Sequence, residues 1–157
     1  GKIKSFFQDQ KIDTDNLEKL LNTKINEDFN SLKNQALIGN KEKTNKLLSN
    51  TVLEPEKNIY YLNLINQRLS KIYEILNVKE KNKDTDLENI VNDIKPPIFW
   101  KDKPPLLAQL KKWSKDKVKY VLNKTYNAEI QIKSSSLIDK NIIMKKLIVD
   151  ICKLANS

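Results

Sequence analysis

The stretch from Pro96 to Pro105, with the sequence PPIFWKDKPP, constrains the fold of this chain most strongly. Together with Trp113, it holds four of the five prolines and both tryptophans of the 157 residues. Proline fixes its own backbone angle and disrupts helix interiors, so this stretch predicts a stiff connector between helical segments. Aromatic side chains dominate core energetics when they are buried. We therefore predict that Trp100 and Trp113 pack in the core, with stacking on nucleic-acid bases as the alternative. Phe99 is predicted to be a structural residue of the connector.

The remainder of the chain predicts helices. Only two residues are glycine, and few segments alternate apolar and polar residues as a half-buried strand would. We expect an all-α fold, a bundle of about seven to nine helices whose N-terminal members are short. The expected helices cover residues 2–7, 14–22, 26–38, 41–50, 55–78, 85–94, 104–113, 114–133 and 139–155.

Residues that commonly start or stop helices set these expected boundaries. Gly39 supplies a left-handed stop, and Asn40 restarts the chain. The expected N-terminal caps are Asp13 or Thr14, Asn26, Ser114, Asp139 and a capping box over Thr85–Glu88. A loop is expected over residues 134–136, where three serines follow one another.

The positive charge of the chain is concentrated in its C-terminal part. Residues 96–157 carry 13 basic and 5 acidic side chains, whereas residues 1–95 carry 16 and 15. Such a surplus favours polyanionic partners, and the cluster of Lys111, Lys112, Lys115, Lys117 and Lys119 is the candidate contact. Lysines spaced along a helix are also typical of a solvated face. Under either interpretation we expect weak, non-specific DNA binding at low salt.

The residue types needed for most catalysis are missing. The chain has no histidine and one cysteine, which excludes a zinc site and a paired Cys and His nucleophile. Gly1 and Gly39 cannot form a glycine-rich phosphate loop. We therefore predict no enzyme activity, no cofactor and no metal, and we expect Cys152 to be a small core residue. No apolar run is long enough to span a membrane. No signal-like segment opens the sequence and one cysteine cannot form an internal disulfide, so we expect a cytoplasmic protein.

The last predicted helix has a wider apolar face than one core requires. Ile142 and Val149 lie seven residues apart among charged residues, next to the broad apolar arc that contains Ile148. We predict that these three residues are candidates for contact with a partner protein, with isolated surface positions as the alternative. Glu129 and Lys133 stand four residues apart in the favourable order for a helix ion pair.

Several of these features occur together in one known family. The sequence from Pro96 to Lys103, followed by Leu110, Trp113–Ser114, Leu122, Ala128–Glu129 and Lys133, is similar to the C-terminal domain of the delta subunit of bacterial DNA polymerase III, a clamp-loader component. Upstream, Asp28–Phe29, Ala36–Lys41, Leu47–Leu48 and Pro55 also resemble the segment that leads into that domain. The resemblance covers most of residues 25–155.

The resemblance implies an assembly role. Residues 1–40 would be the end of a preceding lid-like helical domain, and residues 41–157 a helical collar domain that joins the other clamp-loader subunits. The part of the family that opens the sliding clamp has no counterpart here. The alternative is a basic helical module that binds nucleic acid. Salt distinguishes the two, because phosphate contacts weaken steeply as salt rises and an apolar interface does not.

Overall fold

The computed structural model describes the backbone of residues 2–134 and 139–157, and side chains from residue 14 onward within those ranges. These residues form seven α-helices and two 3-10 turns, with no strand among them. The expected all-α bundle is confirmed. In chain order the elements are α1 (Lys2–Ile38), α2 (Lys41–Asn50), η1 (Pro55–Lys57), α3 (Asn58–Lys81), α4 (Leu87–Asp93), η2 (Trp100–Asp102), α5 (Lys103–Leu110), α6 (Lys115–Ser134) and α7 (Lys140–Ala155).

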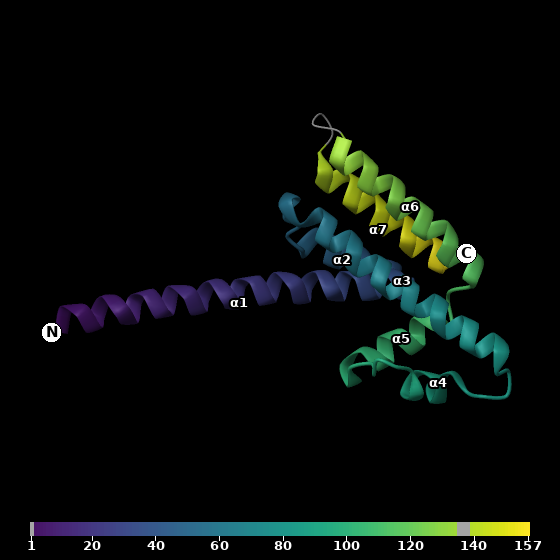
Figure 1. The fold of residues 1–157 in the computed structure, drawn as a ribbon. Helices are drawn as coiled ribbons and strands as arrows, with labels where there is room; N and C mark the ends of the chain where they lie inside the picture. Colours follow the sequence, from purple (N-terminus) through teal and green to yellow (C-terminus); the bar gives the residue numbers. More distant parts are fainter. Residues whose placement is uncertain (1, 135–138) are drawn as a thin grey trace.

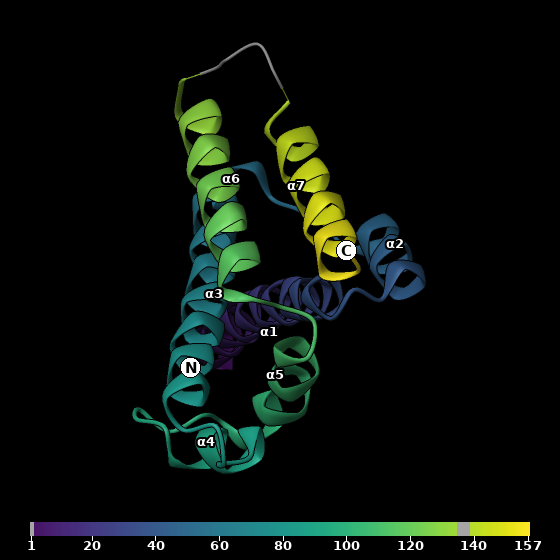
Figure 2. The same ribbon diagram turned by 90° about the vertical axis from the view of Figure 1, so that its right-hand side faces the viewer.

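Helix α3 lies at the centre of the arrangement. Helix α6 runs along it, α7 lies beside α6, and α1 contacts α2, α5 and α7 (Figure 1). Helices α4 and α5 form a smaller layer at the end of α3 that is remote from the C-terminal end of α6 (Figure 2). The N-terminal half of α1 extends away from the other helices as a single arm (Figure 1).

The three short helices expected over residues 2–38 are instead one continuous helix. The residues that suggested breaks are Asp13, Thr14 and Asn26, which favour helix caps but are tolerated in helix interiors. No glycine or proline lies between residues 2 and 38, so nothing in this segment enforces a break.

The helix stop at Gly39 is confirmed. Gly39 has a positive φ of 82°, a backbone angle that residues other than glycine rarely adopt. Asn40 then caps α2, because its side-chain oxygen accepts from the backbone N–H of Lys43. The side-chain nitrogen of Asn156 donates to the carbonyl oxygen of Gly39 at 2.7 Å, which joins this turn to the end of α7.

Two later helix starts are also confirmed, and one cap is wrong. Ser114 accepts from the backbone N–H of Lys117, and Asp139 accepts from that of Asn141. Helix α4 begins after Asp86 and shows no side-chain capping bond, so the predicted capping box does not form. The expected loop after Ser134 lies partly outside the described residues, since positions 135–138 are not described.

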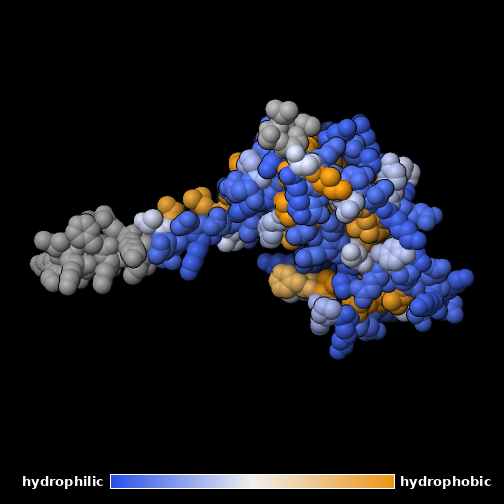
Figure 3. All heavy atoms as spheres, turned by 45° about the horizontal axis from the view of Figure 1, so that its top comes forward, coloured by the Kyte–Doolittle hydropathy of each residue, from blue (hydrophilic) through white to orange (hydrophobic). Residues whose placement is uncertain are grey.

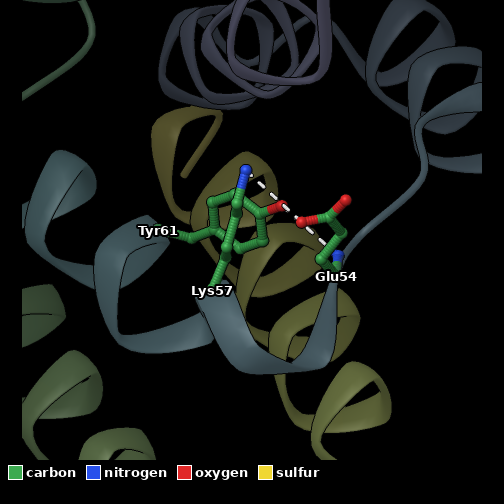
Figure 4. A network of polar contacts seen from close by, with 3 residues as sticks. All are labelled: Glu54, Lys57 and Tyr61. Carbon is green, nitrogen blue, oxygen red and sulfur yellow. Dashed lines mark hydrogen bonds and ion pairs between the residues drawn. The ribbon is translucent and has the colours of Figure 1, made fainter. Parts of the chain in front are cut away.

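One continuous core connects α1 with the later helices. Phe29 of α1 stacks on Tyr61 of α3 with ring centroids 4.2 Å apart. The hydroxyl of Tyr61 accepts the backbone N–H of Glu54 at 3.3 Å, and Lys57 forms an ion pair with the Glu54 carboxylate at 3.3 Å (Figure 4). The core therefore runs across residue 40. The assignment of residues 1–40 to a preceding domain stays a prediction.

Candidate interaction surfaces

The three apolar residues predicted as a contact on α7 take different environments. Ile142 is 60% exposed, whereas Ile148 is fully buried and belongs to the core. Val149 is half-buried and borders a hollow between α7 and α2. Ile148 is therefore not available to a partner, and only Ile142 presents a large apolar surface. The difference arises because the apolar arc of α7 is covered by α1, α2 and α6.

Ile142 borders a hollow of about 370 Å³ between α6 and α7. Lys124 of α6 and Asp150 of α7 form an ion pair at 3.6 Å in the same hollow, and Lys146 also lines it. An exposed apolar side chain surrounded by charged residues resembles the centre and rim of a protein interface. Ile142 is thus the part of the predicted face that the structure leaves open.

The predicted ion pair on α6 is present. The Nζ atom of Lys133 lies 3.0 Å from Oε1 of Glu129, and the Lys133 side chain is largely exposed. Exposed pairs of this type contribute only about 0.3–0.5 kcal/mol to helix stability. Their role here is local.

Cys152 is buried, as predicted for a small core residue.

The two tryptophans of the connector region have opposite environments. Trp113 is 4% exposed, as predicted, and its indole N–H donates to the carbonyl oxygen of Leu37 at 2.7 Å. Trp100 is 67% exposed and Phe99 is also exposed, so the prediction that Trp100 packs in the core is wrong. Ile98 packs against the core in their place. One side of the connector faces the core, and Ile98 occupies that side.

The exposed aromatic residues form a small cluster. The rings of Phe99 and Trp100 lie 5.9 Å apart between centroids, with their planes tilted by 52°. The Nζ atom of Lys101 lies 5.4 Å from the centroid of the Trp100 ring. A cation over an exposed indole is an arrangement that both protein and nucleic-acid partners can use.

The lysine cluster after α5 is only partly free. Lys115 forms an ion pair with Glu80 at 3.0 Å, and both Lys115 and Lys119 lie over the ring of Tyr73. Lys117 donates to the carbonyl oxygens of Lys112 and Ser157, at 3.2 and 2.7 Å. The hydrogen bond between Lys115 and Glu80 raises the pKa of Lys115 and lowers the pKa of Glu80. Much of this charge is therefore engaged within the chain.

The arm of α1 presents an exposed apolar face. Leu17, Leu20 and Leu21 lie on one side of this helix, and all three side chains are exposed. Figure 3 shows hydrophobic residues, in orange, on the part of the arm next to the body. Leucines at i, i+3 and i+4 form one stripe of a helix, which is typical of a surface that packs against another element.

Within the described part of the chain, no cluster of three or more His, Cys, Asp or Glu side chains is arranged to hold a metal ion. None of the helices described combines the length and apolarity that a membrane span requires. Comparisons of the chain with protein-family models, with curated proteins and with solved structures gave no match.

Proposed function

We propose that this chain is a non-catalytic assembly module of a bacterial clamp loader, acting in the cytoplasm as the C-terminal domain of the DNA polymerase III delta subunit. Its role would be to hold the subunits that place the sliding clamp on DNA during replication. The proposal rests on the sequence resemblance over residues 25–155 and on one feature of the fold. That feature is Ile142, which is 60% exposed beside a charged hollow between two helices of the resembling region.

The arm of α1 supports the same interpretation. Three exposed leucines on one helical face bury little apolar surface within this chain. Under the proposal, residues 1–40 are the last part of the preceding domain of the subunit, and these leucines pack against the rest of that domain. The α6–α7 hollow would then contact a neighbouring subunit. The leucine face of α1 and the α6–α7 hollow lie on different elements of the fold, so under the proposal each can contact a different partner.

The test is to replace Ile142 with Asp in the complete subunit and measure co-purification with the other loader subunits. A charged side chain at a buried interface centre should reduce assembly by about tenfold or more. Val52→Asp is the matched control, because Val52 is similarly exposed but lies in the loop after α2. Circular dichroism should show unchanged helix content in both variants. Undiminished assembly of the Ile142→Asp variant would reject this face.

A second candidate function is supported by the exposed Phe99, Trp100 and Lys101 cluster. Aromatic rings can stack on unpaired bases while lysines neutralise phosphates. Against a dedicated nucleic-acid module, Trp113 is buried and three lysines of the predicted basic cluster contact residues of this chain. We therefore expect DNA binding to be weak and non-specific.

Binding of a labelled single-stranded oligonucleotide over a range of salt concentrations tests the second function. Weak binding that disappears near physiological salt agrees with the assembly proposal. Binding that persists at high salt and is lost in Trp100→Ala would favour the nucleic-acid module instead.

A further inference from the structure

Another pocket lies between α1, α3, α5 and the connector, on elements that do not form the α6–α7 hollow. It has a volume of about 450 Å³. Its lining includes Lys33 of α1, Arg68 of α3 and Asp102 of η2. Leu64, Ile98 and Leu106 contribute apolar wall. The pocket therefore combines one buried and one half-buried cation, Lys33 and Arg68, with apolar surface.

Lys33 and Arg68 are held in place by neutral partners. The Nζ atom of Lys33, a residue only 6% exposed, donates to Oδ1 of Asn30 at 2.7 Å. Nη1 of Arg68 lies 3.4 Å from Oε1 of Gln109, and the buried Gln109 in turn donates to Asn34. Within the described residues, neither cation has a carboxylate within the 4.0 Å of an ion pair.

The electrostatic effect of this arrangement is visible on both cations. Burial, and then the charge of Arg68, lower the pKa of Lys33 to about 8. Burial also lowers the pKa of Arg68. Asp102 opposes both shifts, and the third cation, Lys71, is paired with Glu74 at 3.0 Å. One carboxylate, that of Asp102, thus faces the buried Lys33 and the half-buried Arg68, which leaves the pocket electropositive.

The low exposure of Lys33 limits what can reach it. Cations that follow a nucleic-acid backbone are exposed along an open groove, whereas Lys33 is only 6% exposed and lines the pocket together with Leu64, Ile98 and Leu106. An oxyanion at the end of a short arm can enter such a pocket and place its arm against Leu64, Ile98 and Leu106. We propose that this pocket binds a terminal carboxylate on an apolar arm, as an acidic segment of a partner polypeptide presents it. This proposal is independent of the clamp-loader proposal, because any partner with that group would serve.

The direct test uses the full chain and two small probes of the same shape. 3-Phenylpropionate carries the carboxylate, and 3-phenylpropionamide is its neutral counterpart. Isothermal titration should show that the acid binds at least about tenfold more tightly than the amide, because a charge-assisted contact replaces a neutral one. NMR shifts on labelled protein should locate the acid at Lys33 and Arg68. Equal affinity of the two probes would overturn the proposal without any mutation.

Variants then assign the effect to the two cations. Lys33→Met and Arg68→Gln should each weaken binding of 3-phenylpropionate by about tenfold or more. Lys145→Met is the matched control, because it removes one exposed positive charge from α7 and should leave binding unchanged. Wild-type affinity in both Lys33→Met and Arg68→Gln would contradict the assignment.

Two further measurements identify the class of anion that binds and detect the proton that Lys33 takes up on binding. Inorganic phosphate or an oligonucleotide that binds here more tightly than the carboxylate would overturn the carboxylate assignment. Lys33 faces Arg68 and Lys71 of α3 and Asp102 of η2, and near pH 8 it is partly neutral. A bound carboxylate should raise its pKa, so binding at pH 8 should take up protons. Titration in Tris and in HEPES detects this uptake, which must be absent in Lys33→Met.

Discussion

The indole N–H of Trp113 donates a 2.7 Å hydrogen bond to the carbonyl oxygen of Leu37, 76 residues earlier in the chain. Leu37 lies in the last turn of α1, where carbonyl groups have no partner within the helix. The bond therefore satisfies a buried helix end and fixes the turn after α5 against α1. It also gives Trp113 a structural role that Trp100, which is exposed, does not share.

Replacement of Trp113 by Ala should lower the free energy of unfolding by about 3–5 kcal/mol, because it removes a buried aromatic side chain and its hydrogen bond. Trp100→Ala is the matched control and should change stability by less than about 0.5 kcal/mol, since Trp100 is 67% exposed. Urea unfolding followed by circular dichroism measures both. Similar losses in the two variants would contradict the environments described here.

Gly39→Ala should lower stability by about 1–3 kcal/mol, because alanine is strained at a φ of 82°. A Cβ atom there would also lie 2.7 Å from Oδ1 of Asn156. Asn156→Ala alone measures the loss of the hydrogen bond to the Gly39 carbonyl oxygen. The double variant Gly39→Ala with Asn156→Ala also lacks the close approach to Oδ1 but keeps the backbone strain, so comparison with the two single variants separates the effects. Thermal unfolding of the three variants measures this. A neutral Gly39→Ala substitution would show that the turn differs from the one described.

Tyr61→Phe should lower stability by about 1 kcal/mol, because the backbone N–H of Glu54 then loses its acceptor. The ring would remain stacked on Phe29, so the core should keep its packing. Tyr60→Phe is the control at an adjacent and exposed position. Burial raises the pKa of Tyr61, and absorbance titration should therefore find one tyrosine that ionises at higher pH than expected. Loss of stability in Tyr60→Phe alone would contradict this assignment.

Lys33→Met should raise the free energy of unfolding near pH 7 by about 2–3 kcal/mol relative to the wild type. The folded pKa of Lys33 is about 8, against an ordinary value of 10.5. Below pH 8 both states bind the proton, and folding carries the full penalty of a buried charge. Between these two pH values the unfolded chain binds more protons, so the wild type gains stability as pH rises.

The advantage of Lys33→Met should therefore shrink between about pH 8 and pH 10.5, and denaturant unfolding at several pH values measures it. Lys145→Met, at an exposed site, should show no such trend. A difference between Lys33→Met and the wild type that is constant over this range would mean that Lys33 titrates normally.

Local rules predicted much of this fold from the sequence. Gly39, Asn40, Ser114 and Asp139 act where expected, because turn and cap chemistry depends on a few neighbouring residues. The same rules gave false breaks in α1. Asn26 there is a residue type that caps helices and also occurs inside them, and only the missing Gly and Pro could have indicated continuity.

Which side of a segment faces the core was harder to predict. Trp100 and Ile98 are two residues apart in a connector without a helical period, so burial of one over the other depends on contacts with α3 and α5. The cationic pocket was missed, although a signal exists. Lys33 lies four residues after the core residue Phe29, and Arg68 lies three after Ile65, which places both on apolar helix faces.

The most direct test of the assembly proposal is native mass spectrometry of this chain mixed with the other clamp-loader subunits. The spectra should be recorded without DNA after equilibration at about 0.1 M and about 0.5 M salt. An apolar interface predicts a complex of fixed stoichiometry that persists at both salt concentrations. A chain that remains free of those subunits at both salt concentrations would contradict the proposal, and binding of the labelled single-stranded oligonucleotide at the higher salt would then favour a nucleic-acid-binding module.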